Sequence, residues 1–205
     1  MTSYIKLNKA AINNIDLTPG LEFLDWTPQF KQYLNKEAGE EHYKLLNYLA
    51  KKLSEGKQGA VISDVGTFCG SSALAFALAH PSVSVVTYDI MNHIPTANNI
   101  KTISNIPNIK RKYMSCQLDI PNIVKSDLLL LDIDPHEGKQ EKRFVELLMA
   151  GGFKGVMVVD DINTNQGMRD FWSWIPLKKL DVTEHGHWTG TGIVVFDPDT
   201  LDILV

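Results

Sequence analysis

The segment 61–78 constrains the fold more than any other part of the sequence. It begins with a short apolar run that closes at Asp64, passes Gly66 and Gly70, and continues into residues rich in alanine and leucine. Glycine permits backbone conformations, and a close approach of a ligand, that a side chain would forbid. The pattern predicts a buried strand, a tight turn and a helix. Such a turn aims backbone N–H groups and the positive end of a helix dipole at one point, which suits an anionic or carboxylate group.

Strand-like and helix-like segments alternate along the rest of the chain. Expected strands are 61–64, 82–88, 109–114, 127–132, 155–160, 177–182 and 192–196, and expected helices are 40–53, 71–78, 96–105, 139–150 and 166–174. This alternation favours a parallel sheet covered by helices on both faces. The short connection 183–190 implies a hairpin, hence an antiparallel edge. We expect an α/β fold with a doubly wound, mostly parallel, seven-stranded Rossmann-like sheet and an antiparallel last strand.

The length of 205 residues suits one compact α/β domain. Within it we expect an N-terminal helical lid or arm at 1–38 and a cofactor-binding domain at 39–205. The lid would cover the mouth of a site; the alternative is an arm that only packs on the core.

Charge and composition narrow the partners and the compartment. The net charge of −4 gives no broad basic face and argues against nucleic acid. No apolar run reaches membrane-spanning length, and the first twenty residues lack the apolar core of a signal peptide. Two cysteines make no disulfide framework. These features indicate the cytoplasm, with no membrane or nucleic-acid partner. A homodimer contact at Trp172 and Trp174 is left open.

Four predicted strands end in aspartate: Asp64, Asp89, Asp132 and the pair Asp160-Asp161. Ligands of doubly wound sheets bind at the carboxyl ends of the strands, so these acids are expected around one site. Asp89 follows Gly66 by 23 positions (89 − 66). That spacing matches an acid on the next strand that binds both hydroxyls of a ribose.

Two other function classes use the same architecture. A nicotinamide dinucleotide needs G-x-G-x-x-G, but Phe68 and Ser71 stand where its later glycines would lie. A convincing Tyr-x-x-x-Lys pair is also lacking, which disfavours an NAD(P)-dependent oxidoreductase. A non-catalytic module that binds an adenosyl cofactor would need Asp89 but would not need Asp132 or Asp160. The presence of those acids favours an enzyme.

The string Asp64-Val-Gly66-Thr-Phe-Cys-Gly70-Ser-Ser-Ala resembles motif I of class I S-adenosylmethionine-dependent methyltransferases, in the form used by catechol O-methyltransferase and its relatives. The resemblance spans residues 40 to 196. It implies that Asp89 binds the ribose, that the loop 115–117 meets the adenine, and that a serine at the helix start holds the methionine carboxylate. The expected cofactor-binding residues are Asp64, Gly66, Thr67, Phe68, Gly70, Ser71, Ser72, Asp89, Ile90, Cys116, Gln117 and Asp132.

The same resemblance implies a metal. In metal-dependent O-methyltransferases an Asp after the fourth strand and an acidic pair after the fifth hold Mg²⁺, and Asp132, Asp160 and Asp161 match those positions. Carboxylate oxygens are the ligands that Mg²⁺ or another hard divalent cation requires. The cation would lower the pKa of an acceptor hydroxyl.

One departure from the catechol pattern points to a different base. Pro135 stands where that pattern has a lysine, and Asp132-Ile-Asp-Pro-His136 resembles an Asp-x-x-x-His segment of a bacterial branch that acts on small molecules and sugars. This leaves open whether a metal takes part. His136 is the first candidate for general base, because imidazole titrates near neutral pH. Asp132 and His187 are the other candidate catalytic residues.

The remaining histidines carry less information. His185 lies in the same loop as His187, His93 follows Asp89, and His42 and His80 are expected to be structural. The sequence as a whole predicts methyl transfer from S-adenosylmethionine to an oxygen of a small hydroxylated molecule or a sugar unit. It carries no local pattern that identifies the acceptor.

Overall fold

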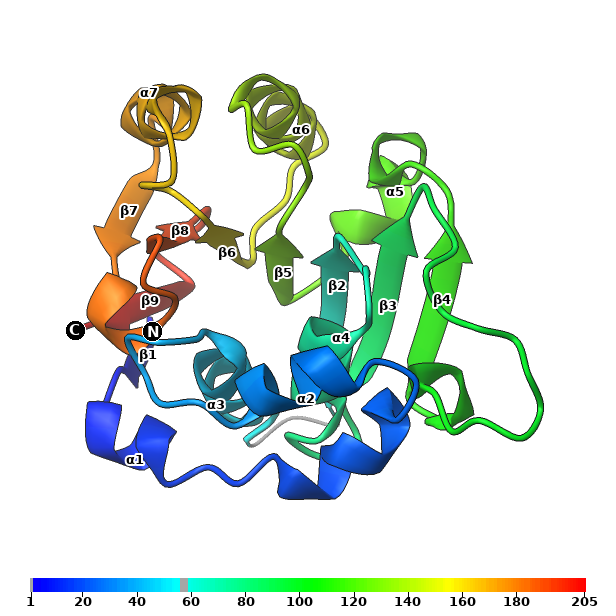
Figure 1. Cartoon of the computed structure of the whole chain (residues 1–205). Helices are drawn as coiled ribbons and strands as arrows, with labels where there is room; N and C mark the ends of the chain where they lie inside the picture. Colours follow the sequence, from blue (N-terminus) through cyan, green and yellow to red (C-terminus); the bar gives the residue numbers. More distant parts are fainter. Residues whose placement is uncertain (1, 56–58) are drawn as a thin grey trace.

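The structure is a computed structural model that describes residues 2–55 and 59–205. Its centre is a sheet of the strands β2 (Val61–Val65), β3 (Ser84–Asp89), β4 (Ile109–Tyr113), β5 (Leu128–Leu131), β6 (Val156–Asp160), β7 (Lys178–Asp181) and β8 (Thr191–Val195). The strand order is β4-β3-β2-β5-β6-β8-β7 (Figure 1). Only β8 runs antiparallel to its neighbours. The predicted fold class is confirmed, and the order reverses between β2 and β5.

Helices cover both faces of this sheet (Figure 1). They are α1 (Lys9–Asn13), α2 (Pro28–Leu34), α3 (Tyr43–Ser54), α4 (Ser71–Ala77), α5 (Ile120–Ile123), α6 (Lys139–Ala150) and α7 (Gln166–Trp174), with the 3₁₀ turns η1 (Thr18–Leu24), η2 (Ile103–Asn105), η3 (Cys116–Leu118) and η4 (Thr183–His185). One hydrophobic core contains buried residues of α3, α4 and the N-terminal segments, and the other contains those of α5, α6 and α7.

The strand β5 shows why the sheet separates two cores. Its four leucines are all buried. Leu128 and Leu130 belong to the core under α3 and α4, whereas Leu129 and Leu131 belong to the core under α6 and α7. Successive side chains of a strand point to opposite faces, so an unbroken apolar run is what a central parallel strand requires.

Two parts of the chain differ from the sequence-based expectation. The helix expected at 96–105 is reduced to η2, while α3 begins at Tyr43 rather than near residue 40. Two strands were missed: β1 (Ser3–Lys6) and β9 (Leu201–Leu204) form a separate parallel pair. In β1 only Ile5 is buried, so its sequence lacks the alternation that marks a longer strand.

The N-terminal segment packs on the rest of the chain. Leu17, Leu24 and Leu34 are fully buried in the core that also contains α3 and α4. Tyr48 of α3 donates its hydroxyl to the carbonyl oxygen of Lys6, at 2.8 Å. Among the described residues, the helices are all too short or too polar to cross a bilayer.

Candidate active site

The turn between β2 and α4 is fixed by its glycines. Gly66 has φ +102°, and a Cβ there would collide with the backbone carbonyl oxygen of Asp132. Gly66 and Thr67 both donate their N–H groups to the carbonyl oxygen of Tyr88, at 3.0 and 3.1 Å. Gly70, at φ +90°, is the N-cap of α4. Only glycine fits this close crossing of β2 over the end of β5.

Asp64 lies beneath the turn. Its side chain is fully buried and accepts a hydrogen bond from the Thr87 hydroxyl at 2.7 Å. Burial raises the pKa of this carboxyl from 3.8 to about 7, against the lowering effect of the hydroxyl donors. Asp64 is thus a buried, hydrogen-bonded carboxyl under the turn.

A pocket of about 470 Å³ opens at the carboxyl ends of β2, β3, β4 and β5. This size is typical of ligand sites, which span roughly 300–1,000 Å³. Seven of the predicted cofactor residues line it: Gly66, Phe68, Asp89, Ile90, Cys116, Gln117 and Asp132. Among the described residues, the other predicted members do not: Asp64, Thr67, Gly70, Ser71 and Ser72.

Further lining residues were not predicted. They are Val65, Tyr88, Met91, Met114, Ile133, Asp134 and Gln140, together with His93 and Ser115, which the sequence only flagged. Most of them adjoin a predicted residue, so their proximity could have been inferred from the strand ends. Gln140 comes from α6, and no spacing along the chain indicates that this helix reaches the pocket.

Asp89 and Phe68 shape the mouth of the pocket. The Asp89 carboxylate accepts hydrogen bonds from the backbone N–H groups of Phe68, at 2.9 Å, and Met91, at 2.8 Å. Phe68 has φ +40° and its ring meets Phe30 of α2 and His93 edge-on, each at 5.1 Å between ring centroids. The helix α2 therefore contacts the predicted cofactor turn. The lid role of residues 1–38 stays a prediction.

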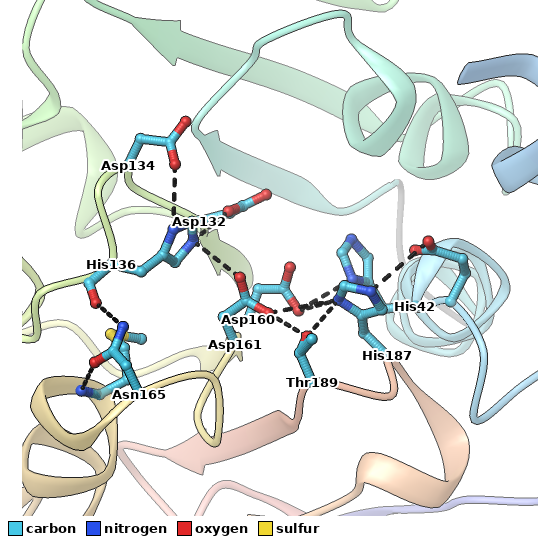
Figure 2. Close-up of polar contacts among 11 residues, drawn as sticks. His42, Asp132, Asp134, His136, Asp160, Asp161, Asn165, His187 and Thr189 are labelled. Atoms are coloured by element: carbon cyan, nitrogen blue, oxygen red, sulfur yellow. Dashed lines mark hydrogen bonds and ion pairs between the residues drawn. The ribbon is translucent and has the colours of Figure 1, made fainter. Parts of the chain in front are cut away.

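His136 lies among three carboxylates (Figure 2). Its Nε2 is 3.0 Å from Asp132 Oδ1 and 3.5 Å from Asp161 Oδ2, and its Nδ1 is 3.2 Å from Asp134 Oδ1. Burial alone would lower the pKa of His136, but the hydrogen bond to Asp132 and the surrounding negative charge raise it to about 9. Asn165 holds the loop in place by donating to the His136 carbonyl oxygen at 2.7 Å.

A second group centres on Asp160 (Figure 2). Its Oδ1 is 3.3 Å from His42 Nδ1 and 3.5 Å from His187 Nδ1. The other nitrogen of His187, Nε2, is 3.7 Å from Glu41 Oε1. Burial opposes the charged form of His42, yet Asp160 raises its pKa to about 9, and the histidines hold the pKa of Asp160 well below its usual range.

His42 was expected to be structural, and the structure places it in this polar group beside His187. Nothing in its helix-start context identifies that position, because the partner residues come from β6 and from the loop before β8. His185 is buried near Glu184, and among the described residues it forms no ion pair or hydrogen bond with the group. Trp188 is 71% exposed beside His187.

The candidate metal ligands differ in part from the predicted set. In the described part of the chain, Asp160, Asp161 and His187 offer ligand atoms within 4.8 Å of one another, and so do Glu41, His42 and His187. Asp132, the third predicted metal ligand, is in neither group; it pairs with His136. The three predicted acids therefore lie along the same sheet edge, with histidines between them.

No protein-family profile and no curated protein sequence matches this chain. Solved structures do. A methyltransferase of Podospora anserina, bound to SAH, has 12% identity and a TM-score of 0.63, over 88% of this chain and 87% of that one. A methyltransferase of Geobacter sulfurreducens has 15% identity and a TM-score of 0.59, over 89% and 91%. An O-methyltransferase of Bacillus cereus, in complex with SAH, has 18% identity and a TM-score of 0.55, over 90% and 93%. The chain shares its fold with these proteins.

Proposed function

We propose that this chain, which has the fold of class I S-adenosylmethionine-dependent methyltransferases, transfers a methyl group from S-adenosylmethionine to an oxygen of a small hydroxylated molecule or a sugar unit. One observation carries the proposal. The pocket that contains the Gly66 turn and Asp89 reaches Asp132 and Asp134, and these acids contact His136. A nucleoside pocket thus adjoins a group that can accept a proton.

The residues of the pocket suit S-adenosylmethionine. The turn at Gly66 leaves no room for a Cβ, and the Asp89 carboxylate lines the pocket with acceptor capacity left for ribose hydroxyls. Cys116 and Gln117 also line the pocket, where the adenine would lie. When bound, the cofactor supplies a methyl group made electrophilic by a positively charged sulfur.

The chain itself has to orient the acceptor and remove its proton. His136 faces Asp132 Oδ1 with Nε2 at 3.0 Å, so its neutral form, populated as pH rises toward its pKa of about 9, would keep the proton there and take the hydroxyl proton at Nδ1, beside the exposed Asp134. Asp132 would stabilise the resulting imidazolium. Alignment of the oxygen with the methyl group supplies most of the remaining acceleration, because an in-line displacement is governed by positioning.

A divalent cation is part of the proposal. Asp160 and Asp161, together with His187, offer donors close enough to share one ion, and the buried Asp160 Oδ1 has no hydrogen-bond partner in the described structure. An ion held there would act as a Lewis acid toward an acceptor hydroxyl. Turnover that is unchanged after chelator treatment would remove the cation from the proposal.

Calorimetry tests the cofactor directly. We expect S-adenosylmethionine and its demethylated product to bind far more tightly than NAD⁺. Tighter binding of NAD⁺ would favour the oxidoreductase alternative. A screen of hydroxylated metabolites and sugar nucleotides with a labelled methyl donor then identifies the acceptor. Cofactor binding without transfer to any acceptor would favour a non-catalytic binding module.

A further inference from the structure

Two segments far apart in the sequence meet at the acceptor end of the site. Glu41 and His42 directly precede α3, and His187 lies in the loop between η4 and β8. The Gly39 N–H donates to the Gly186 carbonyl oxygen at 2.8 Å, which ties the two segments together. The His187 N–H donates to the Thr191 hydroxyl at 2.7 Å. These hydrogen bonds keep the two segments, and with them Glu41, His42 and His187, next to one another.

Asp160 contacts the same nitrogen, Nδ1, in the imidazole rings of His42 and His187. It faces the Nδ1 atoms of His42 and His187, at 3.3 and 3.5 Å, and the Thr189 hydroxyl is a further 2.8 Å contact of His187 Nδ1 (Figure 2). A ring whose Nδ1 faces a carboxylate keeps its proton on that nitrogen and presents a lone pair at Nε2. This is how carboxylates orient metal-binding histidines in proteins.

The opposite side of the rings lacks hydrogen-bond partners. His42 is 3% exposed; its Nδ1 makes the charged contact with Asp160, and its Nε2 has no hydrogen-bond partner within the described residues. His187 Nε2 faces Glu41 Oε1 at 3.7 Å, and Glu41 is only 9% exposed. Buried polar groups normally have partners, so an unpartnered imidazole beside a buried carboxylate indicates a missing ligand.

The charges around this group favour a cation. Across residues 2–55 and 59–205, no lysine or arginine forms an ion pair with Glu41, Asp160 or Asp161; their partners are histidines. Buried carboxylates are costly unless a positive charge compensates them. Two imidazoles and a carboxylate whose ligand atoms lie within 4.8 Å of one another match the donors of a four-coordinate zinc site with one open position.

We propose that Glu41, His42 and His187 bind a divalent transition-metal ion of the zinc class, with both histidines ligating through Nε2 and Asp160 orienting the rings. Imidazole donors favour Zn²⁺, Co²⁺ or Ni²⁺ over Mg²⁺. The proposal goes beyond methyl transfer, because the ion binds whether or not the chain methylates a substrate. It assigns Asp160 to the rings, so this ion and the ion proposed on Asp160, Asp161 and His187 are alternative placements that share His187, and the test separates them.

The test titrates the full chain, freed of metal, with Co²⁺ and follows the visible absorption of the bound ion; Zn²⁺ is measured by calorimetry. We expect binding that a large excess of Mg²⁺ does not reverse. Glu41→Gln, His42→Ala and His187→Ala each weaken it by at least about tenfold, and Asp160→Asn by ~10–100-fold. Glu40→Gln and His80→Gln are exposed matched controls and leave it unchanged.

Thermal unfolding is measured on the same samples, so that a misfolded variant is recognised. S-adenosylmethionine affinity is measured as well, so that failure of the methyltransferase assignment can be distinguished from failure of the metal proposal. Glu41→Gln preserves the shape of the side chain, so it still tests the proposal if His42→Ala does not fold. Absence of a Co²⁺ absorption band in the unaltered chain overturns the proposal. Loss of binding in Asp161→Asn, with Glu41→Gln unaffected, overturns it as well, because the ion then lies on the acidic pair.

Discussion

Among the described residues, three other than glycine adopt left-handed backbone conformations: Phe68 at φ +40°, His136 at φ +56° and Asp161 at φ +59°. Phe68 lies at the mouth of the pocket, and His136 and Asp161 lie in contact with each other among the acids and histidines of the site. Such conformations cost about 1–3 kcal/mol each and persist where surrounding contacts over-determine them. Phe68 is held by Asp89, and His136 by Asn165. The strain is therefore concentrated at the site rather than spread through the loops.

Asp64 should make stability depend on pH. Its pKa is about 7 in the folded chain and near 3.8 when unfolded, so between these values the folded state binds more protons. The contribution of Asp64 to stability then falls as pH rises from about 4 to about 7, by on the order of 4 kcal/mol in total. Chemical unfolding of the native chain and of Asp64→Asn across this range checks it. A constant difference between the two would contradict the assignment.

Asp89→Ala should weaken S-adenosylmethionine binding by about tenfold or more, because the carboxylate is lost from the pocket together with its bonds to Phe68 and Met91. Calorimetry measures the dissociation constant. Asp170→Ala, an exposed acid on α7, is the control and should bind like the native chain. Equal affinity of Asp89→Ala and the control would show that the pocket holds the cofactor differently.

His136→Gln separates binding from chemistry. We expect cofactor affinity within about threefold of native and turnover lowered by ~10²–10⁴-fold, the usual contribution of a general base. Calorimetry and a labelled-methyl assay give the two quantities. Equal losses of affinity and turnover would instead assign His136 to cofactor positioning.

At the level of elements, the strands and helices that shape the cofactor half could be predicted. The run at β5, the helix α6 and the helix α7 were recognised from apolar patterning alone. The turn at Gly66 was recognised from its glycines. The structure shows why glycine is required there, because a Cβ would collide with the carbonyl oxygen of Asp132. The polar group of His42 and His187 was not predicted, because it is assembled by the Gly39–Gly186 hydrogen bond between distant segments.

The helix α2 should act on the pocket through Phe30. Its ring packs on Phe68 at the mouth, so Phe30→Ala should raise the dissociation constant of S-adenosylmethionine several-fold with little loss of global stability. Gln29→Ala, one residue earlier and exposed, is the matched control. If both variants bind like the native chain, α2 only packs on the core.

At the scale of the whole molecule, the pair β1–β9 closes the core beneath α3. The buried Ile5 and Ile203 belong to that core, whereas Leu204 is 41% exposed. Ile203→Ala should lower the free energy of unfolding by ~2–4 kcal/mol, and Leu204→Ala by less than ~1 kcal/mol. Urea unfolding followed by circular dichroism measures both. Similar effects of the two changes would mean that this pair does not support the core.

The strand order also divides the site between two halves of the sheet. The pocket is lined mainly from the ends of β2, β3 and β4, and the histidine group comes from the residues just before α3, from β6 and from the loop before β8. Asp132, after β5, is where the two halves meet. Under the proposed methyl transfer, changes in the loop 183–190 would alter which acceptor is methylated while the donor half stays intact. Such a division would let new acceptor specificities evolve through that loop, and it would make the loop the first place to randomise in a directed-evolution library.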